Sequence, residues 1–395
     1  MTDPPRPRPL LRFYLFAFCL SMGNSIIGMY LSLYFASRGI PEDRIGGLLS
    51  VYYLALPMVV LVLGLLTDRM PCRPLILCGA ALSVLYCVLL PRLSDVRALA
   101  LVMAMAGVGW TLATLSGNVL LLKSLEREAR GRRLSLWVGA SLAGYSLGTA
   151  ASAILVCQLR LPPEIIFHTA LPFYALSFAL ALGLPHAPIE RFPLAQYVRD
   201  VARLPVFCLA LLTFTVGIHF GTEHYALVRF MDDTLSLAGY EIAAYFLVVS
   251  VAMPLASRWA GHAIDARRRL VPILVLAMMV SGLSLALVAG TTGLGGFFFV
   301  RLVHVAADGV LIFGTQMFVS MIFVAGRVGG NYGFNRTVNS LGSSAGAALT
   351  GWLVGAYGLS TPFWVAGVIQ AAMAALLWAL LSRRAHLTSE PAVSH

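Results

Sequence analysis

Long apolar runs repeat along the whole of this 395-residue chain, and they constrain its fold more than any other feature. Hydrophobic residues make up 59% of the sequence and charged residues only 11%, whereas a soluble globular protein carries about 25% charged residues. A helix needs about 20 apolar residues to cross a membrane, and about twelve runs meet that length. The short alternating segments of a transmembrane barrel are not visible. The chain is therefore predicted to be an all-α polytopic membrane protein.

The apolar runs divide evenly between the two halves of the chain. The first six lie near residues 12–35, 45–66, 74–91, 98–122, 134–157 and 165–185. The second six lie near residues 205–230, 240–258, 270–291, 296–323, 334–357 and 361–382. Residues 186–204 carry Pro188 and Pro193 among charges, so we interpret them as a cytoplasmic linker between residues 1–185 and residues 205–395.

Basic residues gather in the loops on one side of the predicted membrane. Clusters such as Arg6–Arg12, Lys123–Arg133 and Arg267–Arg269 all fall on that side, and the opposite loops are short and mixed. By the positive-inside rule, both termini are predicted to be cytoplasmic, in a bacterial inner membrane. The same rule accounts for the net charge of +11, so we expect no nucleic-acid partner.

A polar turn recurs at half the chain length. The stretch GLLTDRMPCR contains Gly64, Asp68, Arg69 and Arg73, and a weaker copy contains Gly261 and Asp265 before Arg267. Asp68 and Asp265 are 197 positions apart, which is almost half of the 395 residues. The sequence therefore predicts a duplication with the same acidic and basic turn in each half.

At this turn the chain resembles the major facilitator superfamily, whose signature between spans 2 and 3 is G-x-L-A-D-R-x-G-R-K. The matching residues are Gly64, Leu66, Asp68, Arg69 and Arg73. Thr67 replaces the alanine, Pro71 replaces the glycine and Cys72 takes one basic position. The signature, its repeat and the six-plus-six arrangement together cover nearly the whole chain.

The resemblance implies two six-helix bundles that rock around a central cavity lined by spans 1, 4, 7 and 10. It also implies a conformational gate at the cytoplasmic seam, formed by Gly64, Asp68, Arg69, Arg73, Gly261 and Asp265. An acidic side chain there can face a helix N-terminus of the other half. The alternative is that Asp68 and Arg69 are solvated loop charges that set the topology.

Small residues predict where the helices pack closely. Gly144 and Gly148 in the fifth run, and Gly342 and Gly346 in the eleventh, form Gly-x-x-x-Gly patterns. This spacing lets helix backbones approach each other, so we expect a packing role and no chemistry.

Ionisable residues within the apolar runs concentrate in runs 7 and 10, and such residues are usually functional. His219 and Glu223 lie four residues apart on run 7, and Arg301, His304 and Asp308 share one face of run 10. At about 1.5 Å per residue, His219 and Asp308 lie about 21 and 22 Å above the cytoplasmic ends of their helices, and Glu223 and His304 about 27 and 28 Å. The sequence therefore predicts contacts between Glu223 and His304 and between His219 and Asp308.

These five residues are the candidates for proton coupling. We assign Asp308 and Glu223 as proton carriers, His219 and His304 as relays or hydrogen-bond partners of the substrate, and Arg301 as the permanent charge. The arrangement is similar to that of sugar/proton symporters of the lactose permease type, which carry a basic residue, a histidine and an acid in span 10. The alternative is a set of permanently neutralised structural ion pairs. His224 and Arg229 are interpreted as structural.

The first half offers neutral polar and aromatic groups on runs 1 and 4. We expect a neutral or amphiphilic ligand to bind Asn24, Tyr30, Trp110, Thr114 and Asn118; ordinary helix packing is the alternative. A polar cluster near the inner end of run 11 could contact the Asp68 turn across the seam; its members are Asn331, Asn335, Arg336 and Asn339. Arg336 could equally be one more topology charge.

These patterns favour a secondary active transporter of a small organic solute, coupled to protons and functional as a monomer in the lipid bilayer. The first alternative is a proton-antiporting exporter of drugs or amphiphilic metabolites, although run 4 lacks the arginine that many such exporters carry. A lipid translocase on the same fold is a further alternative. A membrane-embedded enzyme is disfavoured because no HExxH, GxSxG or P-loop motif is present. We expect no catalytic residues, no cofactor and no metal ion.

Overall fold

The computed structural model describes residues 8–54, 70–124, 130–185, 199, 202–267, 270–323 and 328–382. Within these residues the regular elements are all helices. The first half contains a helix over residues 42–54 together with α1 (Arg8–Gly28), α2 (Leu31–Ser37), α4 (Cys72–Leu89), η1 (Leu90–Arg92), α5 (Val96–Ser124), α6 (Arg130–Ser152), η3 (Ala153–Gln158) and α7 (Ile165–Ala181).

The second half continues the helical pattern. It contains α9 (Leu204–Arg229), η4 (Phe230–Thr234), α10 (Gly239–Arg267), α11 (Leu270–Val288), α12 (Leu294–Ile322), α13 (Val328–Tyr357) and α14 (Thr361–Ser382). Nine helical segments in the described part of the chain are long and apolar enough to span a membrane, and Ile165–Ala181 is a shorter apolar helix. The predicted all-α polytopic fold is confirmed.

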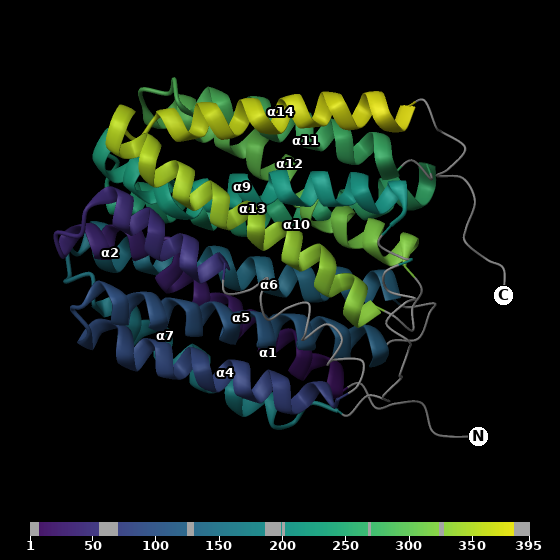
Figure 1. The fold of residues 1–395 in the computed structure, drawn as a ribbon, viewed down its shortest axis with the longest axis horizontal. Coiled ribbons are helices and arrows are strands. Elements are labelled where there is room, and N and C mark those ends of the chain that lie inside the picture. The colour runs from purple at the N-terminus through teal and green to yellow at the C-terminus, as the bar shows by residue number, and fades with distance from the viewer. Residues whose placement is uncertain are drawn as a thin grey trace.

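The two halves use the same packing scheme. In the first half α1 packs against α6 and α7, and α4 packs against α5 and α7. In the second half α9 packs in the same way against α13 and α14, and α11 against α12 and α14. Figure 1 shows the two halves as two groups of roughly antiparallel helices that lie side by side. This correspondence supports the duplication inferred from the half-length repeat.

The glycine pairs lie where helices come closest. A side chain at Gly144 would collide with the backbone of Phe18 in α1, and one at Gly346 would collide with the backbone of Ile218 in α9. No residue larger than glycine fits these positions without moving a helix. The predicted packing role of the two Gly-x-x-x-Gly patterns is confirmed.

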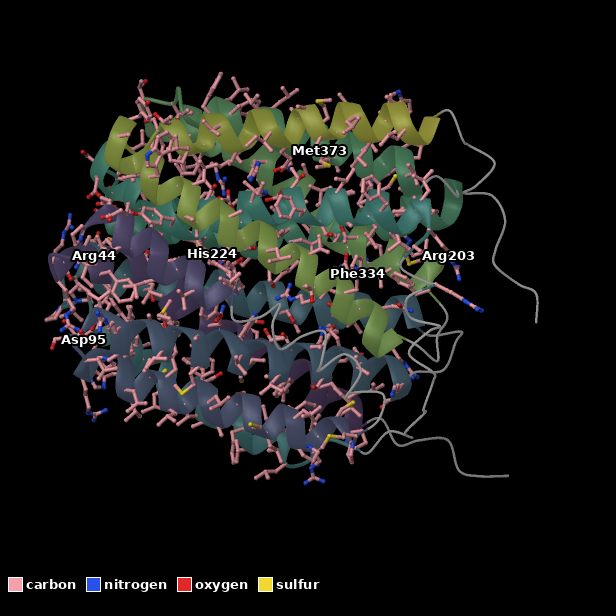
Figure 2. All side chains as sticks on the ribbon, viewed as in Figure 1. Arg44, Asp95, Arg203, His224, Phe334 and Met373 are labelled. Carbon is pink, nitrogen blue, oxygen red and sulfur yellow. The ribbon has the colours of Figure 1, made fainter. Side chains whose placement is uncertain are left out.

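The helices run between two ends of the molecule, which Figure 2 marks by labelled residues. Arg203, just before α9, lies at one end, and Arg44 and Asp95 lie at the other. We name these the Arg203 end and the Arg44 end. By the loop charges, the Arg203 end is the one predicted to be cytoplasmic.

The second copy of the polar turn is helical, which corrects the sequence prediction. Gly261 and Asp265 lie inside α10, which continues to Arg267. The apolar run predicted this helix to stop near residue 258, because polar residues such as Arg258 and His262 begin there. Backbone hydrogen bonding does not require apolar side chains, so α10 continues beyond the end of its apolar run.

Candidate functional site

A cavity of about 230 Å³ lies between the two halves. Residues of α1, α5, α9 and α12 all contribute to its wall, as the resemblance implied, and the helix over residues 42–54, α6, α10 and α13 contribute as well. Its aromatic side chains are Tyr52, Tyr53, Tyr86, Trp110, Tyr145, Phe220, Tyr245 and Phe246. The charged and histidine side chains in the wall are Glu223, His224, Arg301, Asp308 and Arg336.

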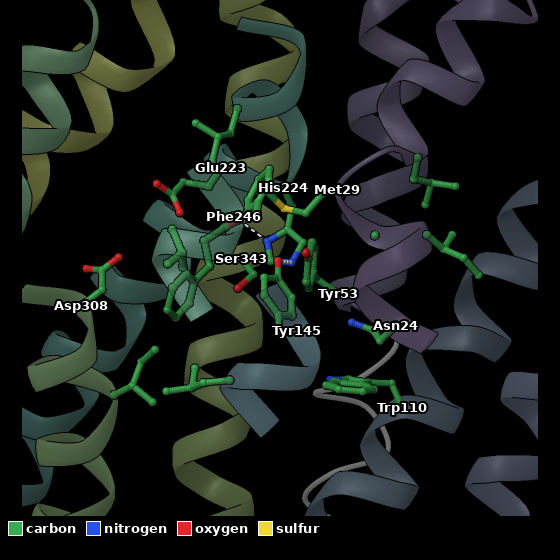
Figure 3. Close-up of a pocket in the computed structure, with 18 of the residues that line it drawn as sticks. Asn24, Met29, Tyr53, Trp110, Tyr145, Glu223, His224, Phe246, Asp308 and Ser343 are labelled. Atoms are coloured by element: carbon green, nitrogen blue, oxygen red, sulfur yellow. Dashed lines mark hydrogen bonds between the residues drawn. The ribbon is translucent and has the colours of Figure 1, made fainter. Parts of the chain in front are cut away.

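Two of the five predicted substrate contacts in the first half line this cavity. Asn24 and Trp110 lie on one side of it, across from Glu223 and Asp308 (Figure 3). The amide oxygen of Asn24 accepts a hydrogen bond from the Tyr52 hydroxyl at 3.1 Å.

The other three predicted contacts, Tyr30, Thr114 and Asn118, are not among the residues that line this cavity in the described part of the chain. Tyr30 follows the end of α1 and is fully buried in the core. Thr114 donates its hydroxyl hydrogen to the Trp110 carbonyl at 2.8 Å, and Asn118 donates to the Thr114 carbonyl at 2.9 Å. The polar groups of Thr114 and Asn118 are therefore used within α5, as the helix-packing alternative expects.

The residues assigned to proton coupling form one buried group, made by α9 and α12. Nε2 of His304 lies 3.1 Å from Oε1 of Glu223 and 3.2 Å from Oδ2 of Asp308. Nε2 of His219 lies 3.3 Å and 3.5 Å from the same two oxygens. The two contacts expected from helix depth, Glu223 with His304 and His219 with Asp308, are both present. The two imidazole rings also face each other, with 3.1 Å between their Nε2 atoms.

Neighbouring helices hold this group in place from several sides. Arg301 forms an ion pair with Glu223 and donates from Nε to the Tyr245 hydroxyl of α10 at 2.8 Å. Ser281 of α11 donates to Oδ1 of Asp308 at 2.7 Å and accepts from Gln370 of α14 at 2.8 Å. Buried polar groups require such partners. The sequence did not identify Tyr245, Ser281 or Gln370, because each comes from a helix whose rotation the apolar pattern does not determine.

The hydrogen-bond pattern indicates where protons sit on the two histidines. Nδ1 of His304 lies 2.9 Å from the Ser281 carbonyl oxygen, which can only accept, so this nitrogen carries a hydrogen. Nδ1 of His219 is buried and has no hydrogen-bond partner among the described residues, so the hydrogen of this ring is better placed on Nε2. A proton on Nε2 of His304 would then be held by the oxygens of both Glu223 and Asp308.

Charge counting gives the same result for the group as a whole. Two carboxylates and one guanidinium leave one uncompensated negative charge among Glu223, Asp308 and Arg301. Their side chains are only 11%, 3% and 2% exposed, and an unpaired charge at such burial is costly. One additional proton shared by the histidines makes the group neutral.

The same four donors could be considered for a metal ion. The ligand atoms of His219, Glu223, His304 and Asp308 lie within 4.8 Å of one another. However, the Glu223 oxygen that faces the histidines also receives Arg301, and a guanidinium at a ligand atom opposes binding of a dication. This arrangement therefore disfavours a dication at these four side chains.

His224 was interpreted from the sequence as structural, but it lines the cavity and joins the two halves. Its Nδ1 donates to the Phe220 carbonyl at 2.7 Å, so its Nε2 accepts a hydrogen bond from the Tyr145 hydroxyl at 2.7 Å. Tyr53 packs edge-on against the same imidazole ring, and Figure 3 shows the three side chains together. Its position directly after Glu223 is the only sequence signal for this role.

Arg229 also connects the halves, at the Arg44 end. Its two terminal nitrogens donate to the two carboxylate oxygens of Glu42 at 2.7 and 2.8 Å. Tyr225 donates to the same carboxylate, and its carbonyl accepts from Ser32 at 2.7 Å. Burial raises the pKa of Glu42, but the hydrogen bonds from Arg229 and Tyr225 outweigh that effect and hold the pKa below its usual value. We call Glu42, Tyr225 and Arg229 the latch.

Two further contacts join the halves near the latch. Arg160 lies 3.5 Å from Asp232, and the backbone N–H of Tyr240 donates to the Gln158 side chain at 3.1 Å.

Of the predicted gate, Gly64, Asp68 and Arg69 lie outside the described residues. Arg73 lies in α4 and donates to the Leu182 carbonyl. Gly261 lies inside α10 and faces the Phe313 ring of α12.

Comparisons with known proteins agree on the fold. The family model described as Major Facilitator Superfamily matches residues 13–234 and 209–394. The crystal structure of a mutant of the nucleoside transporter NupG is similar with a TM-score of 0.73 at 13% identity, covering 94% of this chain and 99% of that one. The crystal structure of the human organic anion transporter MFSD10 (TETRAN) is similar with a TM-score of 0.71 at 16% identity, covering 95% of this chain and 100% of that one.

No curated protein sequence matches the chain. At these identities the two structures show the fold alone, whereas the family model covers nearly all of the chain. Together with the spanning helices and the central cavity, this shows an integral multi-pass membrane protein and a transporter that belongs to the major facilitator superfamily.

Proposed function

We propose that this transporter moves a small organic solute by alternating access and couples that movement to protons. One observation carries the proposal: a buried group of two carboxylates, two histidines and one arginine meets the wall of the cavity between the halves. Glu223, Arg301 and Asp308 line the cavity, and His219 and His304 lie directly behind them.

The position of this group within one half bears on how coupling would work. All five residues belong to α9 and α12, so rigid rocking of the two halves keeps them together. What changes is the side of the membrane to which the cavity opens. A proton would then enter the group from one side and leave on the other, with Asp308 and Glu223 as carriers and the histidines as relays.

Alternating access is supported by the contacts between the halves. The latch, the pair of Arg160 with Asp232 and the hydrogen bond of His224 with Tyr145 all join the first half to the second. These contacts consist of polar groups, which can exchange protein partners for water and so can break and re-form. We further propose that the Arg203 end faces the cytoplasm of a bacterium, that residues 186–204 link the two bundles, and that a monomer is sufficient.

The test is solute uptake into proteoliposomes under an imposed pH gradient, with a panel of small organic acids, amines, sugars and nucleosides. We expect at least one solute to accumulate when the gradient is present and to equilibrate without accumulating when the gradient is collapsed. Accumulation that does not depend on the gradient would contradict proton coupling.

A proton-antiporting exporter of amphiphilic compounds is the second candidate, favoured by the aromatic wall of the cavity. The same assay separates the two, because a symporter accumulates solute on the alkaline side of the membrane and an antiporter on the acidic side.

A further inference from the structure

Arg336 lies on the face of α13 that forms part of the cavity wall. Asn339 and Ser343, three and seven residues further along, line the same cavity, and this spacing puts all three on one side of the helix. The sequence alone is equally compatible with a contact to the Asp68 turn or with a topology charge. The position of Arg336 in the wall adds a third possibility, which is direct contact with the transported molecule.

The other charged and histidine side chains of the wall have strong partners inside the protein. Glu223 is paired with Arg301, Asp308 accepts from Ser281 and lies against His304, and His224 is hydrogen-bonded through both ring nitrogens. The ion pairs found in this wall among the described residues are made by Glu223, Asp308 and Arg301 with one another or with the two histidines. Arg336 is a further guanidinium in the wall, and its position there suits contact with an anionic group of a ligand.

Hydrogen-bond donors and aromatic rings share the cavity wall with this guanidinium. Tyr52, Tyr53 and Asn24 are among these lining residues. Since Tyr52 uses the amide oxygen of Asn24, the amide nitrogen of Asn24 is left to face the cavity as a donor (Figure 3). Trp110 lines the same cavity as Asn24. The guanidinium and the amide suit an anionic group, and the rings suit a flat apolar body.

The size of the cavity is compatible with a small ligand. Its volume of about 230 Å³ holds roughly 15 to 23 water-sized groups, at about 10–15 Å³ for each. A single six-membered ring with a short acidic side chain fits within that volume.

We propose that the transported solute is a small aromatic monocarboxylate, with its carboxylate bound to the Arg336 guanidinium and its ring packed against Trp110 and the neighbouring tyrosines. This substrate class rests on the proposed transport function and adds a chemical identity to it. It also fits the charge balance, because an anion that enters with one proton adds no net charge to the cavity.

Three compounds of nearly equal shape test the proposal: phenylacetate, phenylacetamide and phenethylamine, which are anionic, neutral and cationic at pH 7. Their binding to the purified full-length protein in detergent is measured by calorimetry. We expect phenylacetate to bind at least about tenfold more tightly than the other two, because a bidentate arginine–carboxylate pair is charge-assisted.

Variants of Arg336 then assign this preference to the residue. Arg336→Gln should weaken phenylacetate binding by about tenfold or more and leave phenylacetamide binding within about threefold, while Arg336→Lys should retain part of the preference. Arg92→Gln removes an arginine outside the cavity wall and should bind all three compounds as the wild type does. Unchanged size-exclusion and thermal unfolding profiles confirm that each variant is folded.

Several results would overturn the substrate assignment. These are a wild-type preference for the amide or the amine, a carboxylate preference that survives in Arg336→Gln, and no detectable binding of any of the three compounds.

The outcome for proton coupling is read separately, with Asp308→Asn. One outcome is that Asp308→Asn still binds phenylacetate, while the wild type itself transports solute without protons. In that case the substrate class stands and the proposed coupling fails. If Arg336→Gln keeps the wild-type preference while coupling depends on Asp308, the substrate class fails and the proposed function stands.

Discussion

Breaking the latch should open the Arg44 end of the transporter. Glu42→Gln removes the charge that receives both terminal nitrogens of Arg229 and the hydroxyl of Tyr225. Hydrogen bonds to charged groups contribute about 1.5–3 kcal/mol. Because 31% of the Glu42 side chain is exposed, we take the low end, about 1.5 kcal/mol. That energy shifts the ratio of closed to open molecules about tenfold toward the open form.

The shift can be measured as a distance across the Arg44 end. Spin labels on Ser94→Cys and Thr292→Cys, one in each half and both exposed, report the separation by pulsed electron resonance in a background without the native cysteines. We expect Glu42→Gln to raise the population of long distances. Asp43→Asn, the exposed neighbour, is the matched control and should leave the distribution unchanged. An unchanged distribution in both Glu42→Gln and Arg229→Gln would refute the role of the latch.

Three further predictions concern pH, packing and charge. The pKa of Glu42 is lowered in the closed form, so its stabilisation of the closed Arg44 end is complete above the ordinary carboxyl pKa. That stabilisation is lost as pH falls through the lowered pKa. The same distance distribution should therefore stay constant from about pH 8 to pH 5 and shift only below about pH 4. Gly144→Ala should lower the thermal unfolding midpoint in detergent through a collision worth about 1–3 kcal/mol, whereas Gly139→Ala, which meets nothing within 4 Å, should not. Arg301→Gln should destabilise the protein by about 3–5 kcal/mol in the same assay, because it leaves the Glu223 charge unpaired, and Arg301→Gln combined with Glu223→Gln should recover much of that loss.

Much of the fold could be predicted from the sequence because the membrane imposes a length and an apolar composition on each helix. The contacts of Glu223 with His304 and of His219 with Asp308 were also predictable, since both helices are long and their heights follow from residue counts. Helix rotation and tilt are different quantities, and apolar patterns in a membrane protein carry little information about them.

The residues that were missed or misassigned reflect that limit. Tyr30 lies at the break between α1 and α2, where the chain turns its ring into the core and away from the cavity. Glu42 comes just before a predicted span, so nothing marked it as the partner of Arg229 on the other half. The cavity role of Arg336 depends on which face α13 turns inward, and its position near the end of an apolar run is typical of a topology charge.

The central claim is that the buried group around Asp308 couples solute movement to protons, and proton flux in proteoliposomes tests it most directly. A solute that the wild type transports should carry protons with it. Asp308→Asn should exchange that solute across the membrane without moving protons, and Asp43→Asn should behave as the wild type. Proton flux that persists undiminished in both Asp308→Asn and Glu223→Gln would contradict the claim and would leave the group as a structural ion-pair network.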